Sequence, residues 1–277
     1  MVEFVDTGRH MKQVSPPFQP NIKAGVKNYA EAVLEWNPAS RKGLALFYQF
    51  VTGTSAQDTR FNLIPDGCAN ILFKCDAQDP RVTLSGIIHG EKPIELEPNV
   101  TYFGFKPYSL AGIKSSNLSF AELGSTEVDL KHYFPEVELL TDRVLNNDDF
   151  RRRIRILLAY AQRHLLDHDY VPGLAENLAV SMCVSKGQLQ VGELARMVGY
   201  TDRHCRSRFK KMFGITMAHY NRIMRFQNAV KMICSKNSVS LTNIAHTNGY
   251  FDQAHFIKEF KKFATYPPTK FRENLLA

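Results

Sequence analysis

The chain is poor in cysteine and shows no cysteine pattern. Its 277 residues include five, in an odd and scattered set without any Cys-x-x-Cys pair: Cys68, Cys75, Cys183, Cys205 and Cys234. This spacing excludes a disulfide framework and a zinc ribbon. We interpret the five as small buried apolar side chains of a protein that works in a reducing cytoplasm.

Long apolar runs are also lacking. No run approaches the roughly 20 residues that a membrane helix needs, and residues 1–20 lack the apolar centre of a signal peptide. We therefore expect no membrane partner, and we expect residues 1–20 to be a flexible lead-in. A hydrophobic content of 44% and a charged content of 22% are ordinary for a globular chain of this length, which is sufficient for two domains.

Acidic residues are scarce in the last hundred positions. Residues 172–277 carry 16 Lys and Arg against 6 Asp and Glu, a net charge of +10, whereas residues 1–171 carry 19 against 21, a net charge of −2. This asymmetry predicts a polyanion-binding domain joined to a near-neutral domain, although a membrane-surface patch has the same sign.

One pattern occurs twice in the cationic segment. The first copy opens with apolar residues at i, i+3, i+4 and i+7 of a short helix: Val191, Leu194, Ala195 and Val198. Gly199 ends that helix, and Thr201 or Asp202 caps the next one. The predicted buried face of the second helix holds Cys205, Phe209 and Met212. Two short helices around a glycine turn predict a helix-turn-helix unit.

The second copy lies about fifty residues later. Its expected apolar faces hold Leu241, Ile244 and Ala245 in the first helix and Phe256, Phe260 and Phe263 in the second. Gly249 makes the turn, Asp252 is the expected cap, and Tyr250 matches Tyr200. The Phe-Lys-Lys of residues 209–211 recurs with a one-residue insertion. Two such units in register, both basic, are a much stronger signal than one.

Residues 216–233 connect the two copies without an internal Pro or Gly. Their apolar stripe is discontinuous: Tyr220, Ile223, Met224, Ala229 and Met232. A helix of about 18 residues is about 27 Å long. With the width of the two units added, this length matches the roughly 34 Å between successive major-groove faces on one side of a DNA duplex. We expect a stiff connector that holds the two units one DNA turn apart.

Residues 172–277 resemble the AraC/XylS family of bacterial transcription regulators. The resemblance rests on the two helix-turn-helix units, on residues 225–233 of the connector and on the closing FKKFATYPPTKFRE, with Pro268, Phe271 and Arg272 at the expected places. Thr265 stands where glycine is usual, and Met217 where the first unit often has proline. Both departures leave local turn geometry open.

The N-terminal part is similar to the sensory domain of one subgroup of these regulators, a β-rich cupin-like sandwich. The similar stretches are LIPDGCANILF and YFGFKPYSLAGI. Short β-prone runs separated by Gly, Pro and Asp independently favour a sandwich or barrel. They are residues 45–51, 60–65, 69–74, 81–89 and 100–106, with a tight turn at Pro65-Asp-Gly67.

The predicted fold class is therefore α+β. We expect a flexible lead-in (1–20), a cupin-like β-sandwich or barrel for sensing or dimerisation (21–140), a linker helix region (141–171) and an all-α DNA-binding domain with two helix-turn-helix units (172–277). In residues 148–168, capped by Asp148 or Asp149, one apolar stripe holds Ile154, Leu157, Leu158, Ala161 and Leu165. This helix either packs on its own sandwich or pairs two subunits.

The exposed faces of the second helix of each unit are the candidate DNA-binding surfaces. In the first unit they carry Arg203, Arg206, Ser207 and Lys210, and the resemblance implies base contacts for the first three. In the second unit they carry Gln253, Ala254, His255, Ile257, Lys258 and Lys261. Arginine suits guanine, glutamine suits adenine, and isoleucine suits a thymine methyl group. Lys211 and Lys262 are expected on phosphates, and Arg225 in a salt bridge or on a phosphate.

Candidates for other chemistry are weak. His89, Glu91, Glu95 and Glu97 faintly resemble cupin metal ligands, but a single histidine is too few. Six aromatic residues line a cavity or form plain core: Phe47, Tyr48, Tyr102, Phe103, Phe105 and Tyr108. Ser115 and Ser116 have no ordered base beside them. We expect no metal, no cofactor and no catalytic residue.

The leading hypothesis is a cytoplasmic, homodimeric transcription activator that binds double-stranded promoter DNA beside RNA polymerase. Its N-terminal domain would respond to a small-molecule effector. Two alternatives remain at this point: a cupin-type enzyme with a DNA-anchoring tail, and an interaction protein that binds no ligand.

Overall fold

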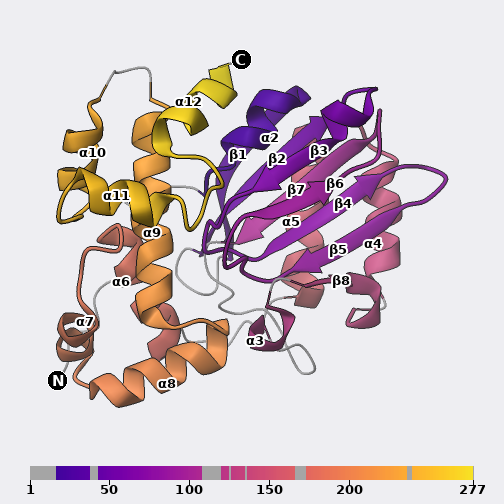
Figure 1. Cartoon of the computed structure of the whole chain (residues 1–277). Helices are drawn as coiled ribbons and strands as arrows, with labels where there is room; N and C mark the ends of the chain where they lie inside the picture. The colour runs from indigo at the N-terminus through magenta and orange to yellow at the C-terminus, as the bar shows by residue number, and fades with distance from the viewer. Residues whose placement is uncertain are drawn as a thin grey trace.

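The computed structural model describes residues 17–37, 43–107, 120–124, 126–134, 136–165, 173–235 and 239–276. Strands dominate the first half of the chain and helices the second half (Figure 1). The predicted α+β layout, with a sheet-rich part before an all-helical part, is confirmed. No helix in the described ranges combines the length and the apolar character needed to cross a bilayer.

In the described ranges, eight strands form two antiparallel sheets. The larger sheet has the order β1-β2-β7-β4-β5-β8, and the smaller sheet pairs β3 with β6. The strands are β1 (Lys27–Asn37), β2 (Gly43–Val51), β3 (Arg60–Leu63), β4 (Asn70–Cys75), β5 (Arg81–Ser85), β6 (Lys92–Glu95), β7 (Thr101–Pro107) and β8 (Glu127–Asp129). The five predicted runs correspond to β2, β3, β4, β5 and β7, whereas the sequence pattern does not anticipate the other three.

Both faces of the larger sheet are covered, because side chains alternate along its strands. Phe47 joins a core beneath two helices, α4 (Val137–Leu145) and α5 (Phe150–Tyr160). Its neighbours Leu46 and Tyr48 join a second core beneath α2 (Pro20–Gly25) and the smaller sheet. A side chain at position 104 is excluded, since a Cβ there would lie 2.0 Å from the Tyr48 ring.

The helix predicted over 148–168 is α5 followed by a π-helical turn, η4 (Ala161–Leu165). Asp149 caps it by accepting a hydrogen bond from Arg152 N at 2.7 Å. Ile154 and Leu157 are buried in the core under the sheet. Of the two interpretations, packing on its own sandwich is confirmed. Arg153 lies within this face, 2% exposed, and its guanidinium donates to Gln49 Oε1 at 2.7 Å.

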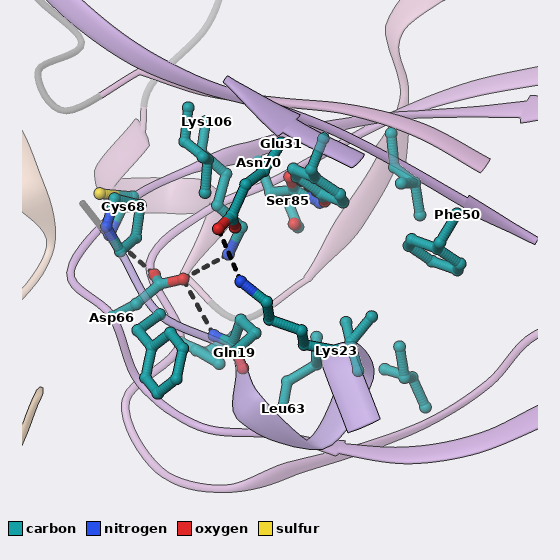
Figure 2. A pocket seen from close by; sticks show the side chains of 18 of the residues that line it. Gln19, Lys23, Glu31, Phe50, Leu63, Asp66, Cys68, Asn70, Ser85 and Lys106 are labelled. Atoms are coloured by element: carbon teal, nitrogen blue, oxygen red, sulfur yellow. Dashed lines mark hydrogen bonds and ion pairs between the residues drawn. The ribbon is translucent and has the colours of Figure 1, made fainter. Parts of the chain in front are cut away.

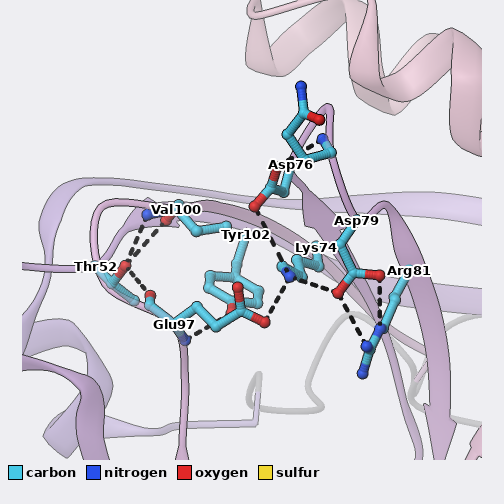
Figure 3. Close-up of polar contacts among 9 residues, drawn as sticks. Thr52, Lys74, Asp76, Asp79, Arg81, Glu97, Val100 and Tyr102 are labelled. Atoms are coloured by element: carbon cyan, nitrogen blue, oxygen red, sulfur yellow. Dashed lines mark hydrogen bonds and ion pairs between the residues drawn. The ribbon is translucent and has the colours of Figure 1, made fainter.

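Ion pairs and hydrogen bonds connect the ends of the interior strands β2, β4 and β7 of the larger sheet (Figure 3). The Lys74 side chain is 7% exposed, and its ammonium lies 2.9 Å from Asp79 and 2.5 Å from Glu97. The Thr52 hydroxyl donates to the Glu97 carbonyl at 2.6 Å and accepts from Val100 N at 3.0 Å. These contacts hold the loop before β7 against the sheet.

The carboxylates weighed as metal ligands have protein partners. Glu97 pairs with Lys74, Glu95 lies 3.4 Å from Arg60, and Glu91 accepts hydrogen bonds from Thr265. The part of the chain that the structure describes holds no group of three or more His, Cys, Asp or Glu arranged to bind a metal ion. Ser115, Ser116 and Tyr108 lie outside the described residues.

The second half consists of α6 (Leu174–Val184), α7 (Val191–Val198), α8 (Asp202–Phe213), α9 (Met217–Ile233), α10 (Leu241–Thr247), α11 (Gln253–Phe260) and α12 (Pro268–Leu276). The long helix α9 runs through the middle of this group, with α7 and α8 at one end and α10 and α11 at the other (Figure 1). One apolar core joins these helices, and Ile64 and Ile87 of the sheet part belong to it. The two halves are therefore docked through apolar contact.

Residues 17–20 correct the predicted flexible lead-in. Pro17 and Pro20 are buried, and Phe18 is half-buried against the helical core. The side chain of Gln227 in α9 accepts a hydrogen bond from Phe18 N at 3.1 Å and donates to Phe18 O at 3.2 Å. The packing partner lies 209 positions away, so a local pattern does not reveal it.

Candidate nucleic-acid interface

The first helix-turn-helix unit forms as the sequence predicts. Helix α7 ends at Gly199, whose φ of 71° is the left-handed conformation that glycine favours. Of the two candidate caps, Thr201 is the one used, and its hydroxyl accepts from His204 N at 3.3 Å. Cys205 and Phe209 are fully buried. The third buried position differs from the prediction, because Phe213 occupies the core and Met212 is half-buried.

The second unit has the same plan. Gly249 has a φ of 69°, and Asp252 caps α11 by accepting from His255 N at 2.6 Å. The three predicted phenylalanines are buried: Phe256, Phe260 and Phe263. Each unit thus buries one face of its second helix and leaves the opposite face to solvent.

The nine predicted DNA-binding side chains are all exposed. They are Arg203, Arg206, Ser207, Lys210 and Lys211 on α8, Gln253, His255 and Lys258 on α11, and Lys261 at the end of α11. Within the described residues their side chains make few contacts, among them a hydrogen bond that His255 Nδ1 accepts from Phe251 N at 3.3 Å. Arg206 lies 4.0 Å from Asp202, and Gln253 accepts from the Thr242 hydroxyl at 2.9 Å. Ile257, weighed as a contact to thymine, is half-buried and packs against the core instead.

Two arginines of α9 fix the second unit to the connector. Arg222 donates to Glu259 Oε2 in α11 at 2.7 Å, and its guanidinium lies 5.3 Å from the centre of the Phe263 ring. Arg225 lies 5.5 Å from the centre of the Tyr250 ring. Among the described residues Arg225 therefore makes a cation–π contact in place of the expected salt bridge, and the alternative of a phosphate contact stays a prediction. The sequence pattern assigns no role to Arg222, although its positive charge on the connector is evident.

Burial and charge act in opposite directions on the Glu259 carboxyl. Its burial raises the pKa, but hydrogen bonds from Lys262 and Arg222, and their positive charges, lower it by more. The net shift of the pKa is downward, and the ionised carboxylate holds α11 against α9. Lys262, expected on a phosphate, is bonded to this carboxylate.

A cavity lies between the larger sheet, α2 and the smaller sheet (Figure 2). Its volume is about 60 Å³. Of the six aromatic residues predicted to line a cavity or form core, Tyr48 lines it, whereas Phe47, Phe103 and Phe105 belong to the core beneath α4 and α5. Tyr102 is core on the cavity side of the sheet.

Polar groups in the cavity wall are paired. Lys106 and Asp66 are both nearly buried and form an ion pair, which Gln19 extends by donating to Asp66 Oδ2 at 2.9 Å (Figure 2). Burial lowers the pKa of Lys106, but the charge of Asp66, its hydrogen bond and the nearby Tyr48 and Cys68 together outweigh burial, and the net shift is upward. The Tyr48 hydroxyl donates to Asn70 at 2.7 Å. Burial raises the pKa of Tyr48 to about 12, so this hydroxyl stays protonated.

The cavity wall also touches the connector. The turn predicted at Pro65-Asp-Gly67 forms, with a φ of 75° at Gly67. The Asp66 side chain faces the cavity, while the Pro65 carbonyl accepts from Gln227 Nε2 of α9 at 2.8 Å. A Cβ at position 67 would lie 2.5 Å from Met224 of α9. The same tight turn thus lines the cavity and packs against α9.

The five cysteines are free thiols, and Cys205 is fully buried. Burial raises the pKa of Cys75, Cys183 and Cys234 to about 11 each. The prediction of buried side chains is confirmed for Cys205, whereas the other four cysteines are half-buried.

Comparison with known proteins matches the helical half. A family model described as a helix-turn-helix domain covers residues 194–274. The probable transcription factor PqrA of Proteus vulgaris is 35% identical over 86 residues, which are 31% of this chain and 70% of PqrA. An uncharacterized HTH-type transcriptional regulator of Staphylococcus aureus is 29% identical over 84 residues, 30% of this chain but 11% of that protein.

Two solved structures are similar at low identity. The C-terminal domain of AraT, a response regulator from Geobacillus stearothermophilus, has a TM-score of 0.35 at 19% identity and covers 37% of this chain and 86% of its own. Apo ToxT K231A from Vibrio cholerae has a TM-score of 0.42 at 11% identity and covers 90% of this chain and 98% of its own. The assignment therefore rests on the sequence match to PqrA and on the paired units described above. The chain belongs to the AraC-type family of helix-turn-helix transcription regulators.

Proposed function

We propose that α8 and α11 enter two adjacent major-groove segments of promoter DNA and read base pairs there. Arg203, Arg206 and Ser207 would contact bases from the first unit, and Gln253 and Lys258 from the second. Lys210, Lys211 and Lys261 would contact phosphates, with His255 as a polar neighbour of the contacted bases. Base edges give sequence preference, whereas phosphate contacts give affinity on any sequence.

One observation carries this proposal: all nine side chains are exposed on helices whose opposite faces are buried, in a segment with a net charge of +10. Helix α9, with 17 residues, spans about 26 Å. That length supports simultaneous contact with successive grooves on one face of the duplex.

Selection of duplexes from a random library by the full chain, followed by hydroxyl-radical footprinting, tests the proposal. We expect two protected segments about 10 bp apart on one face of the DNA. A single protected segment, or binding without sequence preference, would contradict the reading of two grooves.

We also propose that the sheet-rich N-terminal domain has a sensing role. The domain limits predicted from the sequence, 21–140, 141–171 and 172–277, are proposed as working boundaries. In the cavity wall, Asp66 lies one residue from Pro65, which binds α9, and Gln19 one residue from Phe18, which also binds α9. A compact molecule bound beside Asp66 and Lys106 would therefore alter the contacts that residues 18 and 65 make with α9. Since the cavity has a volume of only about 60 Å³, the effector is small, or it opens the wall on entry.

A panel of small metabolites screened by thermal shift tests this role. Saturation at 100 times Kd stabilises the protein by about 2.7 kcal/mol. The effect of an active compound should disappear in Lys106→Met, which keeps the side-chain length and removes the charge. If no compound raises the melting temperature, the chain acts without an effector.

We further propose that the protein is a cytoplasmic homodimer that activates transcription beside RNA polymerase. The named relatives are transcription factors or regulators, which supports a role without catalysis. Leu139 of α4 is 66% exposed on the side away from the sheet core, a position compatible with pairing through the linker helices. Light scattering at high micromolar concentration tests the dimer, and a result of monomer alone would contradict it. In vitro transcription from a bound promoter tests whether the protein activates or represses.

A further inference from the structure

Phe251 is the most exposed large apolar side chain in the described part of the protein. Its side chain is 86% exposed, compared with 66% for Leu139 and 51% for Tyr200. It directly precedes Asp252, the cap of α11, and therefore stands at the N-terminal end of the second DNA-reading helix. A phenylalanine left in water does not gain the favourable free energy that burial of its ring would give.

The turn of the second unit contains one residue more than the turn of the first. In the first unit, Gly199 and Tyr200 are followed at once by the cap Thr201; in the second, Phe251 separates Tyr250 from the cap Asp252. The insertion seen in the sequence therefore lies here. Both tyrosine amides close the preceding helix in the same way, Tyr200 N on Ala195 O at 3.1 Å and Tyr250 N on Ala245 O at 3.0 Å.

Packing of the turn does not require the Phe251 ring. Tyr250 already fills the space between the turn and the core, since it is 6% exposed and its ring lies 5.1 Å from that of Phe256. The backbone of Phe251 is nevertheless fixed, because its N–H donates to His255 Nδ1 at 3.3 Å. The backbone is thus held in place while the ring stays in solvent, where another molecule can contact it.

The surroundings of Phe251 indicate which partner. The exposed residues that follow it on α11 are those of the proposed DNA surface: Gln253, Ala254, His255 and Lys258. Asp252, the one acidic neighbour in this stretch, is occupied as the helix cap. In helix-turn-helix proteins the N-terminal residues of the second helix meet the base edges. The ring is thus continuous with a cationic, groove-facing surface.

In the major groove the apolar group that DNA offers is the C5-methyl group of thymine. We infer that Phe251 is a specificity-determining residue that packs on a thymine methyl group in the groove segment bound by the second unit. The inference rests on the proposed function and adds a residue and a base to it. It also explains why the half-buried Ile257 is not needed for this contact.

Methyl deletion in the DNA tests the inference directly. A duplex chosen by the full chain from a random library is resynthesised with each thymine of the second segment replaced singly by deoxyuridine, which removes the methyl group and keeps the pairing. Wild-type affinity should fall about three- to tenfold at one or two positions. Phe251→Ala should lose a similar factor on the thymine duplex and show no difference between thymine and uracil there.

Val33→Ala, which changes an exposed apolar residue of the other half, is the matched control and should bind as wild type does. If Phe251→Ala still distinguishes thymine from uracil at every position, or binds with wild-type affinity, the inference is overturned. Normal DNA binding with lost transcription would also overturn it, by assigning Phe251 to a protein partner. A chain that selects no sequence contradicts the proposed function, whereas specific binding that ignores Phe251 contradicts this inference alone.

Discussion

Gln227 of the connector helix forms two hydrogen bonds with the backbone of Phe18 in the N-terminal segment. Phe18 N donates to Gln227 Oε1 at 3.1 Å, and Gln227 Nε2 donates to Phe18 O at 3.2 Å. The amide of Gln227 is 5% exposed and donates a further bond to Pro65 O at 2.8 Å. A single side chain of the DNA-binding half thus satisfies three backbone groups of the sheet-rich half. This relation joins the cavity wall to the helix that spaces the two DNA-reading units.

Gln227→Ala should loosen the docking of the two halves. The three backbone groups lose their partner, and an unsatisfied buried polar group costs about 1–3 kcal/mol. We expect a lower melting temperature and faster amide exchange over residues 17–26 and 64–68. Gln188→Ala is the control, because Gln188 is exposed and donates a single bond, to Thr247 O at 2.8 Å. Equal behaviour of the two variants would contradict a special role for Gln227.

Arg206→Ala should weaken binding to the preferred operator by about 1–3 kcal/mol and relax the preference at one base pair. Lys261→Ala should weaken binding evenly across sequences and reduce the slope of log K against log salt by about 1. Gel-shift titrations with single-base variants at several salt concentrations separate the two effects. An even loss for Arg206→Ala on every sequence assigns Arg206 to a phosphate.

Glu259→Gln should destabilise the second unit by about 1–3 kcal/mol at neutral pH, because charged hydrogen bonds to Arg222 and Lys262 are lost. Since the folded-state pKa of Glu259 is lowered, its contribution is complete above the unfolded value of about 4.3 and is lost as the pH falls through the folded value. Denaturant titrations at pH 7 and below pH 4 measure this difference. Glu273→Gln, which removes an exposed pair with Lys270, should change stability by less than about 0.5 kcal/mol.

His219 makes the docking of the two halves sensitive to acid. Its ring nitrogen Nε2 lies 3.0 Å from His89 O across the interface, and burial lowers the pKa of His219. The unfolded chain, with a His pKa of about 6.5, binds more protons than the folded one between the two values. Stability should therefore decrease as the pH falls through about 6.5, and His219→Gln should reduce that slope. Identical pH profiles for the two proteins would contradict the assignment.

Local chemistry explains what the sequence predicts well. Gly199, Gly249, Thr201 and Asp252 act on residues within four positions of themselves, so their roles are visible in a short window. The short apolar, β-prone runs likewise predict β2 and β7, which are buried on both sides. The exposed faces of α8 and α11 follow from the helical period of 3.6 residues, because a buried stripe fixes the opposite face.

Features that depend on distant partners are not predictable in this way. The residue that bonds Gln227 is 209 positions away, and the cavity ion pair joins Asp66 and Lys106 across 40 positions. Arg153 resembles a surface arginine in sequence, yet it is buried because Gln49 accepts from it across 104 positions. The exposure of Phe251 also escapes prediction, because Tyr250 beside it takes the buried place.

The central claim is that a stiff helix holds two DNA-reading units one duplex turn apart. Insertion of 5 bp or 10 bp between the two contacted segments of a selected operator tests it, with affinity measured by gel shift. Because α9 is a continuous helix of 17 residues, both insertions should reduce affinity to that of a duplex with one segment. Unchanged affinity after either insertion would contradict a fixed spacing between α8 and α11.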